Sequence, residues 1–407
     1  MVRPKKSRIR HRAVNLQAIT AIFALTLATM TAVTVPQAHA QTWTTLHTFT
    51  GADGVDPEAG LTMDREGNLY GTAYQGGNLS DCGGLGCGTV FKLTHSISGW
   101  VVSVLYTFSG PGGANPMARV IFGPDGSLYG TTVYGGSANQ GTVFKLTPPP
   151  SACRAALCPW TETVLHSFQG GGDGEQPQSG DLVFDQAGNI YGATPYGGPP
   201  SGCYGETCGV VYELTPSNGG WTESILYRFS GGTDGGNPFA GLIFDTAGNL
   251  YGTTAYGESF CGVVYKLTPS GSGWHESVIS SFTGFEPCHP YGGLIFDQAG
   301  NLYGVDNLEG VVYELTPSGG TWTLSQLYAF DAYQGSFAKL AMDPAGNLYG
   351  TLFIADWEVF KLTPSTGGWT QTGFSGGDGL YPFGNVILDA NGNVYGTASS
   401  VAFEITP

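Results

Sequence analysis

From residue 43 onward, short runs of alternating apolar and polar residues are separated by Gly, Asn, Asp and Pro. Four kinds of run recur, and we name them A to D after these examples: "AGLIFD" (240–245), "NLYGTT" (249–254), "GVVYKLTP" (262–269) and "WTESILYRF" (221–229). β-Branched and aromatic residues are abundant in each run, and none shows a sustained 3.6-residue apolar period. Each run therefore predicts a short β-strand.

The four runs recur seven times along the chain. The turn between runs A and B carries a glycine, as in "DQAGNIYG" (185–192), and this glycine returns at spacings of 59, 62, 60, 52, 46 and 46 residues. Run C and the tryptophan that opens run D also occur seven times. Four short strands in each repeat of this length predict the blade of a β-propeller, with D as the outermost strand.

The two ends of the repeated region complete one another. Residues 43–49 form a lone D run, whereas the last repeat ends with a C run at residues 401–407. Pairing the two would close a ring without a large unpaired edge, whereas an open solenoid would need polar caps, which we do not find. We therefore predict an all-β fold, a seven-bladed β-propeller of four-stranded blades that is closed by strand 43–49.

The phrases "GNLYGTT", "GTVFKLTP" and "AGLIFD" resemble the GloVer-type (Gloeo/Verruco) tandem repeats of exported bacterial proteins. The resemblance covers about residues 43–407. It implies a propeller-like exported protein, and it supplies no catalytic residues to carry over to this chain. Because the chain lacks a C-terminal sorting tail, the resemblance does not extend to attachment at the cell surface.

The first forty residues have the order of an export signal. Six basic residues come first, an apolar stretch follows from Leu16 to Val35, and "AHA" ends at Ala40. This order predicts a secretory signal peptide at 1–40 and a single propeller domain at 41–407. The alternative is an uncleaved anchor, because the apolar stretch is nearly long enough to span a bilayer. We expect a bacterial protein that is secreted, periplasmic or held in the cell envelope, without membrane insertion after cleavage.

The charge balance excludes some partners. The formal net charge is −16, and removal of residues 1–40 takes away six basic and no acidic groups, which leaves −22. A surface this acidic repels phosphate backbones and anionic lipids, so we expect no nucleic-acid partner. We expect a monomer that binds a glycan or an extracellular or cell-surface protein.

Eight cysteines fall into four close pairs, which in an exported chain predict disulfides rather than zinc sites. Three pairs have the spacing C-x4-C, and the fourth would join a B–C loop to the following D–A loop on the same face of the disc. The predicted bridges are Cys82–Cys87, Cys153–Cys158, Cys203–Cys208 and Cys261–Cys288.

Most of the repeated polar and aromatic residues have a structural interpretation. An aspartate before Gly-Asn, such as Asp245, caps the amides of the A–B turn; a ring of cation-binding carboxylates is the alternative. The strand-B tyrosines and strand-D tryptophans are interpreted as packing between blades, with ligand stacking as the alternative. His47 and His166 take matching places in D strands and are interpreted in the same way.

Two sets of loops carry candidate binding residues. The B–C loops of the first four blades are the longest, and Tyr among Gly, Asn and Ser suits contacts to sugars or peptides. We propose as ligand-binding residues Tyr74, Tyr134, Tyr196, Tyr204 and Tyr256. The D–A loops repeat an aspartate four residues before a proline, which indicates an Asx turn or, as the alternative, calcium ligands. These residues are Asp53, Asp173, Asp234 and Asp378.

No catalytic residue is identified from the sequence. The histidines of residues 41–407 are scattered, and no H-E-x-x-H, G-x-S-x-G or phosphate-binding glycine loop is present. The leading hypothesis is a non-enzymatic exported propeller, without cofactor, that binds its ligand through the B–C and D–A loops of the first four blades. The alternatives are an extracellular carbohydrate-active hydrolase or lyase with carboxylates at the central pore, and a structural envelope component.

Overall fold

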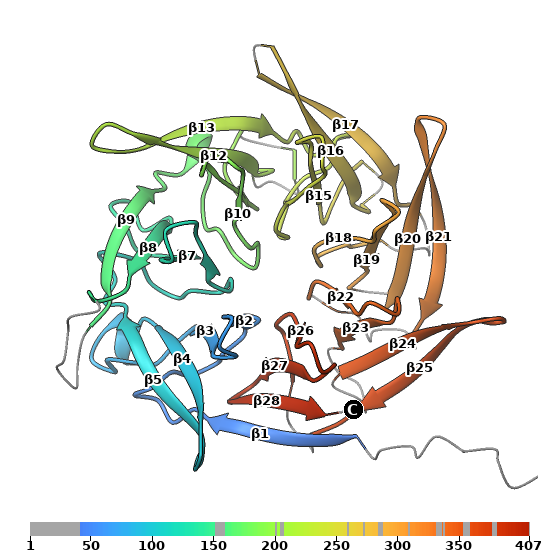
Figure 1. Cartoon of the computed structure of the whole chain (residues 1–407). Helices are drawn as coiled ribbons and strands as arrows, with labels where there is room; N and C mark the ends of the chain where they lie inside the picture. Colours follow the sequence, from blue (N-terminus) through green and yellow to red (C-terminus); the bar gives the residue numbers. More distant parts are fainter. Residues whose placement is uncertain are drawn as a thin grey trace, which may run out of the picture. The chain divides into compact units, whose positions relative to one another are not determined.

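The computed structural model describes residues 41–150, 159–199, 202–203, 207–258, 260–271, 273–283, 288–307, 310–330, 336, 338–352, 359–376 and 381–406, all within the compact unit Gln41–Pro407. In this part of the chain, 28 strands form seven antiparallel sheets of four strands each, arranged around a centre (Figure 1). The predicted seven-bladed β-propeller is confirmed. None of the helices in these residues is long and apolar enough to cross a membrane.

Each blade orders its strands A, B, C, D from the centre outward, and we number the blades along the chain. The A strands of blades 1 to 7 are β2 (Thr62–Met63), β6 (Ile121–Phe122), β10 (Val183–Phe184), β14 (Ile243–Phe244), β18 (Ile295–Phe296), β22 (Ala341–Met342) and β26 (Ile387–Leu388). The B strands are β3 (Leu69–Ala73), β7 (Leu128–Thr132), β11 (Ile190–Thr194), β15 (Leu250–Thr253), β19 (Leu302–Val305), β23 (Leu348–Thr351) and β27 (Val394–Ala398).

The outer strands follow the same scheme, and two short 3-10 helices, η2 (Cys82–Gly84) and η3 (Gly171–Asp173), lie in loops. The C strands are β4 (Thr89–Ser96), β8 (Thr142–Thr147), β12 (Val210–Ser217), β16 (Val263–Ser270), β20 (Val311–Ser318), β24 (Val359–Ser365) and β28 (Val401–Thr406). The D strands are β5 (Gly99–Thr107), β9 (Thr161–Ser167), β13 (Gly220–Arg228), β17 (Gly273–Ser281), β21 (Thr321–Ala329), β25 (Gly368–Phe374) and, for blade 7, β1 (Thr42–Thr48).

The ring closes as predicted. Strand β1 pairs antiparallel with β28, with Thr42 opposite Thr406 and Thr48 opposite Val401. At the same junction the Thr397 hydroxyl of blade 7 donates a 2.5 Å hydrogen bond to the carbonyl of Ala59 in blade 1. The first and last strands of the propeller therefore share one sheet, which covers the edge that each would otherwise expose.

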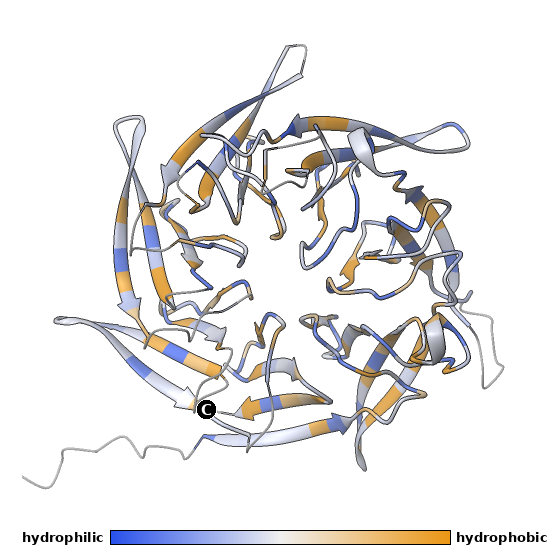
Figure 2. Ribbon diagram, turned by 180° about the vertical axis from the view of Figure 1, so that it is seen from behind, coloured by the Kyte–Doolittle hydropathy of each residue, from blue (hydrophilic) through white to orange (hydrophobic). Residues whose placement is uncertain are grey.

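Burial explains why the strands differ in composition. Strand B is buried along its whole length, whereas D strands such as β13 alternate between exposed and partly buried residues. Neighbouring blades cover both faces of the inner strands. The sequences of these strands are therefore continuously apolar rather than alternating, as in other sheets that are covered on both sides. Figure 2 shows the strongly hydrophobic segments within the strands.

The core lies between blades rather than within them. In the described residues, each of the seven blade junctions has its own cluster of buried side chains. At the junction of blades 3 and 4, Tyr191 of strand B contacts Trp274 of the next blade edge to face, with ring centroids 6.0 Å apart. The interpretation of the repeated Tyr and Trp as packing residues is confirmed.

The polar groups of the A–B turn form hydrogen bonds with one another. The Asp245 carboxylate accepts hydrogen bonds from the backbone amides of Ala247 and Asn249, from the Asn249 side chain and from the Tyr251 hydroxyl. Gly248 adopts a φ of 83°, which favours glycine. The same pattern recurs at Asp64, Asp185, Asp297 and Asp343. The turn aspartates are therefore capping groups, as predicted.

Three of the four predicted disulfides are present: Cys82–Cys87, Cys203–Cys208 and Cys261–Cys288. The last joins the B–C loop of blade 4 to the D–A loop that enters blade 5, as the predicted topology requires. Cys153–Cys158 lies outside the described residues. Three disulfides indicate an oxidising, extracytoplasmic environment.

Candidate ligand-binding site

The B–C and D–A loops meet on one face of the propeller. In each of the first four blades, an isolated antiparallel bridge joins the B–C loop to the D–A loop that enters the same blade; two of these bridges are Glu175 to Tyr196 and Gly236 to Tyr256. Loops of neighbouring blades are also joined. The backbone amide of Asn237, in the D–A loop that enters blade 4, donates to the carbonyl of Cys208 in the B–C loop of blade 3. In the first four blades, these loops are therefore joined to one another by hydrogen bonds.

A pocket of about 510 Å³ opens on this face between blades 3, 4 and 5. Aromatic side chains dominate its lining, with one amide, one imidazole and one half of a disulfide among them. The lining residues are Tyr196, Cys203, Asn237, Phe239, Tyr256, Phe260, His289 and Tyr291.

The aromatic rings contact one another around the opening. Phe239 lies against Tyr291 with ring centroids 4.8 Å apart and an interplanar angle of 34°, and Tyr196 meets the edge of Phe239 at 6.1 Å. Tyr256 meets both Tyr291 and His289 nearly at right angles. The hydroxyl oxygens of Tyr256 and Tyr291 are 2.8 Å apart and hydrogen-bonded. These contacts hold the rings of three blades in a fixed arrangement.

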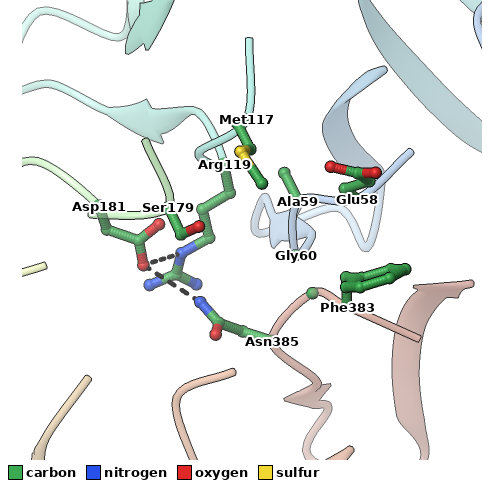
Figure 3. Close-up of a pocket in the computed structure, with 10 residues that line it drawn as sticks. Glu58, Ala59, Gly60, Met117, Arg119, Ser179, Asp181, Phe383 and Asn385 are labelled. Carbon is green, nitrogen blue, oxygen red and sulfur yellow. Dashed lines mark hydrogen bonds and ion pairs between the residues drawn. The ribbon is translucent and has the colours of Figure 1, made fainter. Parts of the chain in front are cut away.

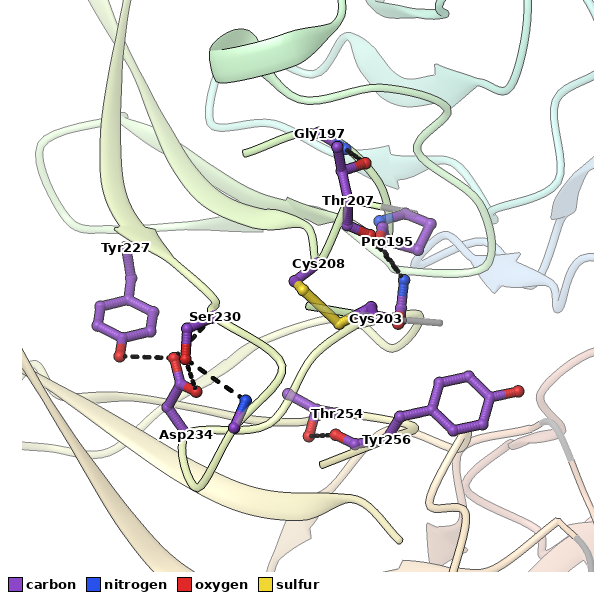
Figure 4. The surroundings of a disulfide bond; sticks show 12 residues. Pro195, Gly197, Cys203, Thr207, Cys208, Tyr227, Ser230, Asp234, Thr254 and Tyr256 are labelled. Carbon is purple, nitrogen blue, oxygen red and sulfur yellow. Dashed lines mark hydrogen bonds between the residues drawn. A yellow bond between two sulfur atoms is a disulfide. The ribbon is translucent and has the colours of Figure 1, made fainter. Parts of the chain in front are cut away.

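The local backbone sets the direction of these rings. Asn237 adopts a φ of 56°, and its side-chain amide donates to the carbonyls of Pro195 and Thr207 across the blade junction. This anchored turn precedes Pro238 and positions Phe239. Figure 4 shows the Cys203–Cys208 disulfide and the Gly197 amide bonded to Thr207 in the same loop region.

A buried carboxylate holds the opposite wall of the pocket. Asp306 accepts 2.6 Å hydrogen bonds from the backbone amides of both Cys288 and His289. It stands where blades 2 to 4 have a threonine, namely Thr132, Thr194 and Thr254. Burial lowers the pKa of His289, which outweighs the opposing influence of Asp306. The imidazole is therefore neutral at neutral pH.

The structure brings together two of the five tyrosines predicted to bind a ligand, Tyr196 and Tyr256. Tyr74 and Tyr134 lie near one another beside Glu58, away from this pocket, and the pKa of Tyr74 is raised by burial and by these two neighbours. All four are half-buried. Tyr204 lies outside the described residues.

Sequence reasoning missed Phe239 and Tyr291. Both follow the proline of a D–A loop, in "NPF" and "HPY", where the first three blades have Glu, Met and Gln. The signal was present as a change from non-aromatic to aromatic residues at one repeat position. It was not recognised because the repeat alone does not show that this position faces the loop side of the disc.

The aspartates considered as calcium ligands cap their own loops. Asp53 accepts from the Thr50 amide and lies 2.7 Å from the His47 imidazole, and Asp234 accepts from the Ser230 amide and hydroxyl. Asp173 accepts a 2.6 Å bond from the Gln169 amide. These three residues lie in separate loops, and Asp378 lies outside the described residues.

The centre of the ring holds a group of charged residues from the segments before strand A (Figure 3). Asp181 pairs with Arg119 at 2.6 Å and accepts a 3.4 Å hydrogen bond from Asn385, which is 204 residues away in the chain. Lys339 lies close to both charges, and burial lowers its pKa to about 8. Blade 3 has one more residue between the loop proline and the turn aspartate than blades 1, 4, 5 and 7, and Asp181 stands in this longer segment.

The same centre contains the carboxylates nearest to the predicted pore site. Asp181 and Glu58 both line a pocket of about 150 Å³, together with Met117 and Phe383. Burial and the neighbouring Asp56 raise the pKa of Glu58. His289 lines the aromatic pocket rather than this centre.

Comparison with known proteins agrees with the fold. The profile of a family described as the Gloeobacter/Verrucomicrobia repeat matches residues 29–157 and 156–356. No curated protein matches the sequence.

Solved structures that resemble the chain include a lyase, the extracellular domain of a two-component system and a WD40 propeller domain. Virginiamycin B lyase from Staphylococcus aureus aligns with a TM-score of 0.56 and 12% identity over 90% of this chain and 99% of that chain. The extracellular domain of a hybrid two-component system from B. thetaiotaomicron aligns with a TM-score of 0.58 and 11% identity, over 90% of this chain and 40% of that chain. The WD40 propeller domain of Doa1 aligns with a TM-score of 0.54 and 13% identity, over 90% of this chain and 97% of that chain. At such identities the likeness shows the fold alone.

Proposed function

This chain belongs to the Gloeobacter/Verrucomicrobia repeat family, and from that premise we propose that it is an exported, non-enzymatic propeller that binds a glycan in the aromatic pocket of blades 3 to 5. The observation that carries the proposal is the convergence of rings from three blades on one opening. Aromatic rings offer a large rigid contact area, and their negative faces attract the C–H groups on the flat side of a sugar ring. The tyrosine hydroxyls of the lining suit sugar hydroxyls.

The charge of the lining favours a neutral ligand. Among the described residues that line the pocket there is no Asp, Glu, Lys or Arg, and His289 is neutral at neutral pH. An anionic or cationic ligand would lose hydration in such a site without gaining a partner charge. A neutral sugar combines an apolar face with polar edges and avoids this cost. A peptide ligand, the other partner expected from the sequence, would bind through uncharged side chains.

The proposed setting is outside the cytoplasm. The predicted signal at residues 1–40 and the three disulfides support secretion or delivery to the periplasm or cell envelope of a bacterium, with the protein acting as a monomer. Disulfides beside the pocket hold loop shape where no strand runs.

The proposal is tested with an array of neutral glycans and an array of peptides, using the purified chain without residues 1–40. We expect binding to one or more glycans, lost in Tyr196→Ala and Phe239→Ala. Tyr134→Ala is the matched control, because Tyr134 holds the equivalent loop position in blade 2 outside the pocket. Binding to peptides alone would replace the glycan by a protein ligand, and equal loss in the control and pocket variants would overturn the assignment of the site.

A second candidate function rests on the central carboxylates. A carbohydrate-active hydrolase or lyase needs an acid with a raised pKa near an ionised carboxylate, and Glu58 and Asp181 line one pocket. The ion pair of Asp181 with Arg119 instead suits a fixed structural charge. Turnover on a panel of polysaccharides that disappears in Glu58→Gln would favour the enzyme, and turnover that is absent or unchanged in this variant would count against it.

A further inference from the structure

A histidine and two carboxylates meet at the junction of blades 2 and 3, away from the aromatic pocket. His166 lies in β9, Asp173 ends η3, and Glu223 lies in β13 of the next blade. One ligand atom from each residue lies within 4.8 Å of the others. His166 Nε2 is 3.3 Å from Asp173 Oδ2 and 3.6 Å from Glu223 Oε1.

Neighbouring junctions use the same positions without a histidine. Between blades 1 and 2, the Tyr106 hydroxyl donates to Glu162 at 2.7 Å. Between blades 3 and 4, the Tyr227 hydroxyl donates to Asp234 at 3.1 Å, and Glu276 stands at the position of Glu223. A tyrosine at this place gives a carboxylate one hydrogen bond and offers no metal ligand comparable to an imidazole nitrogen.

The junction of blades 7 and 1 has the histidine without the second carboxylate. His47 lies 2.7 Å from Asp53, but Val102 takes the position of Glu223. In the part of the chain that the structure describes, His166, Asp173 and Glu223 are the one group of three such ligands found together.

The spacing of the three groups fits a metal ion. Zinc bonds to His nitrogen and carboxylate oxygen are about 2.0–2.2 Å, so a tetrahedral site places two ligand atoms about 3.3–3.6 Å apart. The two distances from His166 Nε2, 3.3 and 3.6 Å, fall in this range. The exposed fractions of the three side chains, 18%, 22% and 12%, leave an approach for an ion and for a water as fourth ligand.

One carboxylate oxygen at the site has no hydrogen-bond donor. Glu223 Oε1 is buried and accepts no hydrogen bond. The same is true of Glu162 Oε1 and Glu276 Oε1 at the neighbouring junctions, but here a histidine nitrogen lies 3.6 Å away. Burial and contact with Asp173 raise the pKa of Glu223 to about 9.

Arg228 is the cation nearest to the group. Its guanidinium Nη2 donates a 3.1 Å hydrogen bond to the carbonyl of Gly172. Its charge lowers the pKa of Glu223, but this influence is weaker than those of burial and Asp173. Among the described contacts Arg228 forms no ion pair with either carboxylate, and Asp173 Oδ2 also accepts the hydrogen bond from the Gln169 amide.

We propose that His166, Asp173 and Glu223 bind a divalent transition-metal ion, best matched by Zn²⁺, which links blade 2 to blade 3. Calcium prefers six to eight oxygen ligands, so the imidazole and the small ligand number disfavour it. The metal crosslinks two blades through side chains that are 57 residues apart in sequence. This proposal is independent of the glycan site.

The chain itself supplies the test variant. His166→Tyr converts this junction into the arrangement of Tyr227, Asp234 and Glu276, which the same fold already accommodates. Chelator-treated protein is titrated with Zn²⁺, Mn²⁺ and Ca²⁺ by calorimetry, and Tm is recorded with and without each ion. We expect one Zn²⁺ per chain, a raised Tm, and binding to Ca²⁺ that is far weaker.

Loss of a direct ligand should weaken Zn²⁺ binding by more than about 100-fold, because even indirect partners of metal sites contribute 10–100-fold. His166→Tyr and Glu223→Gln should show this loss, whereas Glu276→Gln at the next junction should not. Absence of Zn²⁺ binding to the parent chain, or equal binding by the His166 and Glu276 variants, overturns the proposal. The visible absorption of Co²⁺ bound to the parent chain, with an imidazole and oxygen ligand set, tests it without relying on the folding of any variant.

Discussion

At the residue scale, the repeat separates positions that carry the fold from positions that are free to vary. Asp245 and its counterparts accept several hydrogen bonds from their own turns, and this aspartate occurs in every blade except blade 2, which has Gly123 at the position. The residue after the loop proline is not needed for these turn hydrogen bonds, and it changes from Glu58 in blade 1 to Phe239 in blade 4. The candidate ligand-binding residues therefore lie at repeat positions where packing of the blade does not require one particular residue.

Removing a turn carboxylate should destabilise one blade. In Asp245→Ala, the amides of Ala247 and Asn249 and the Tyr251 hydroxyl lose their acceptor. Hydrogen bonds to a charged acceptor contribute about 1.5–3 kcal/mol each, and exposed donors recover part of this by binding water. We expect the free energy of unfolding to fall by about 1–3 kcal/mol, measured by urea denaturation. An unchanged midpoint would show that the turn does not depend on its cap.

The same carboxylates predict how stability depends on pH. Burial raises the pKa of Asp64, Asp245, Asp297 and Asp343, but hydrogen bonds from their turns outweigh it, and each pKa lies below 3.8. A lowered folded-state pKa contributes stability above the unfolded-state value, and this stability is lost as pH falls through the folded-state pKa. Urea midpoints should therefore decrease from about pH 4 downward. The decrease should be smaller in Asp245→Asn, and an equal decrease in both proteins would contradict the assignment.

At the scale of the strand, a glycine in strand B makes room for an aromatic ring in strand C. A methyl group added to Gly252 would collide with the Tyr265 side chain and approach Leu242 of the inner segment. Tyr265 is fully buried, so its ring cannot move into solvent. This explains why a glycine follows the tyrosine in every strand B.

We expect Gly252→Ala to lower the free energy of unfolding by about 1–3 kcal/mol or more, the usual cost of overpacking a core. Gly220→Ala in the C–D hairpin is the control, because its added methyl group would meet no atom within 4 Å. Urea denaturation of both variants distinguishes them, and equal midpoints would show that the ring is not held against strand B.

At the scale of the whole molecule, closure of the ring depends on one strand. Strand β1 completes blade 7, and residues from blades 2, 3 and 7 meet at the centre through Arg119, Asp181 and Asn385. Each blade junction has its own apolar cluster, so stability depends on every neighbour being present.

Deletion of residues 41–50 should open the ring. Strand β28 would become an unpaired edge, and the apolar side chains of Leu46 and Phe49 would be missing from the junction of blades 7 and 1. Exposed edges pair with other chains, so we expect self-association and a lower Tm, measured by light scattering and thermal unfolding. A monomeric deletion variant with the parent Tm would show that closure does not stabilise the fold.

The fold was predictable from the sequence because every blade repeats the same packing solution. Strand order, ring closure, the turn caps and three disulfides follow from local patterns that occur several times. The site was predictable only in part: Tyr196 and Tyr256 were identified, but Phe239, Tyr291 and Asp306 were not. Their importance depends on how segments of different blades converge, and no single repeat contains that information.

The most direct test of the central claim is the affinity of the best neutral glycan for Phe239→Ala and Tyr134→Ala, measured by calorimetry against the parent chain. Loss of a ring at the centre of a site removes more than about 1 kcal/mol of binding energy, so the affinity of Phe239→Ala should fall about tenfold or more. The affinity of Tyr134→Ala should match the parent. Unchanged glycan affinity in folded Phe239→Ala would contradict the account.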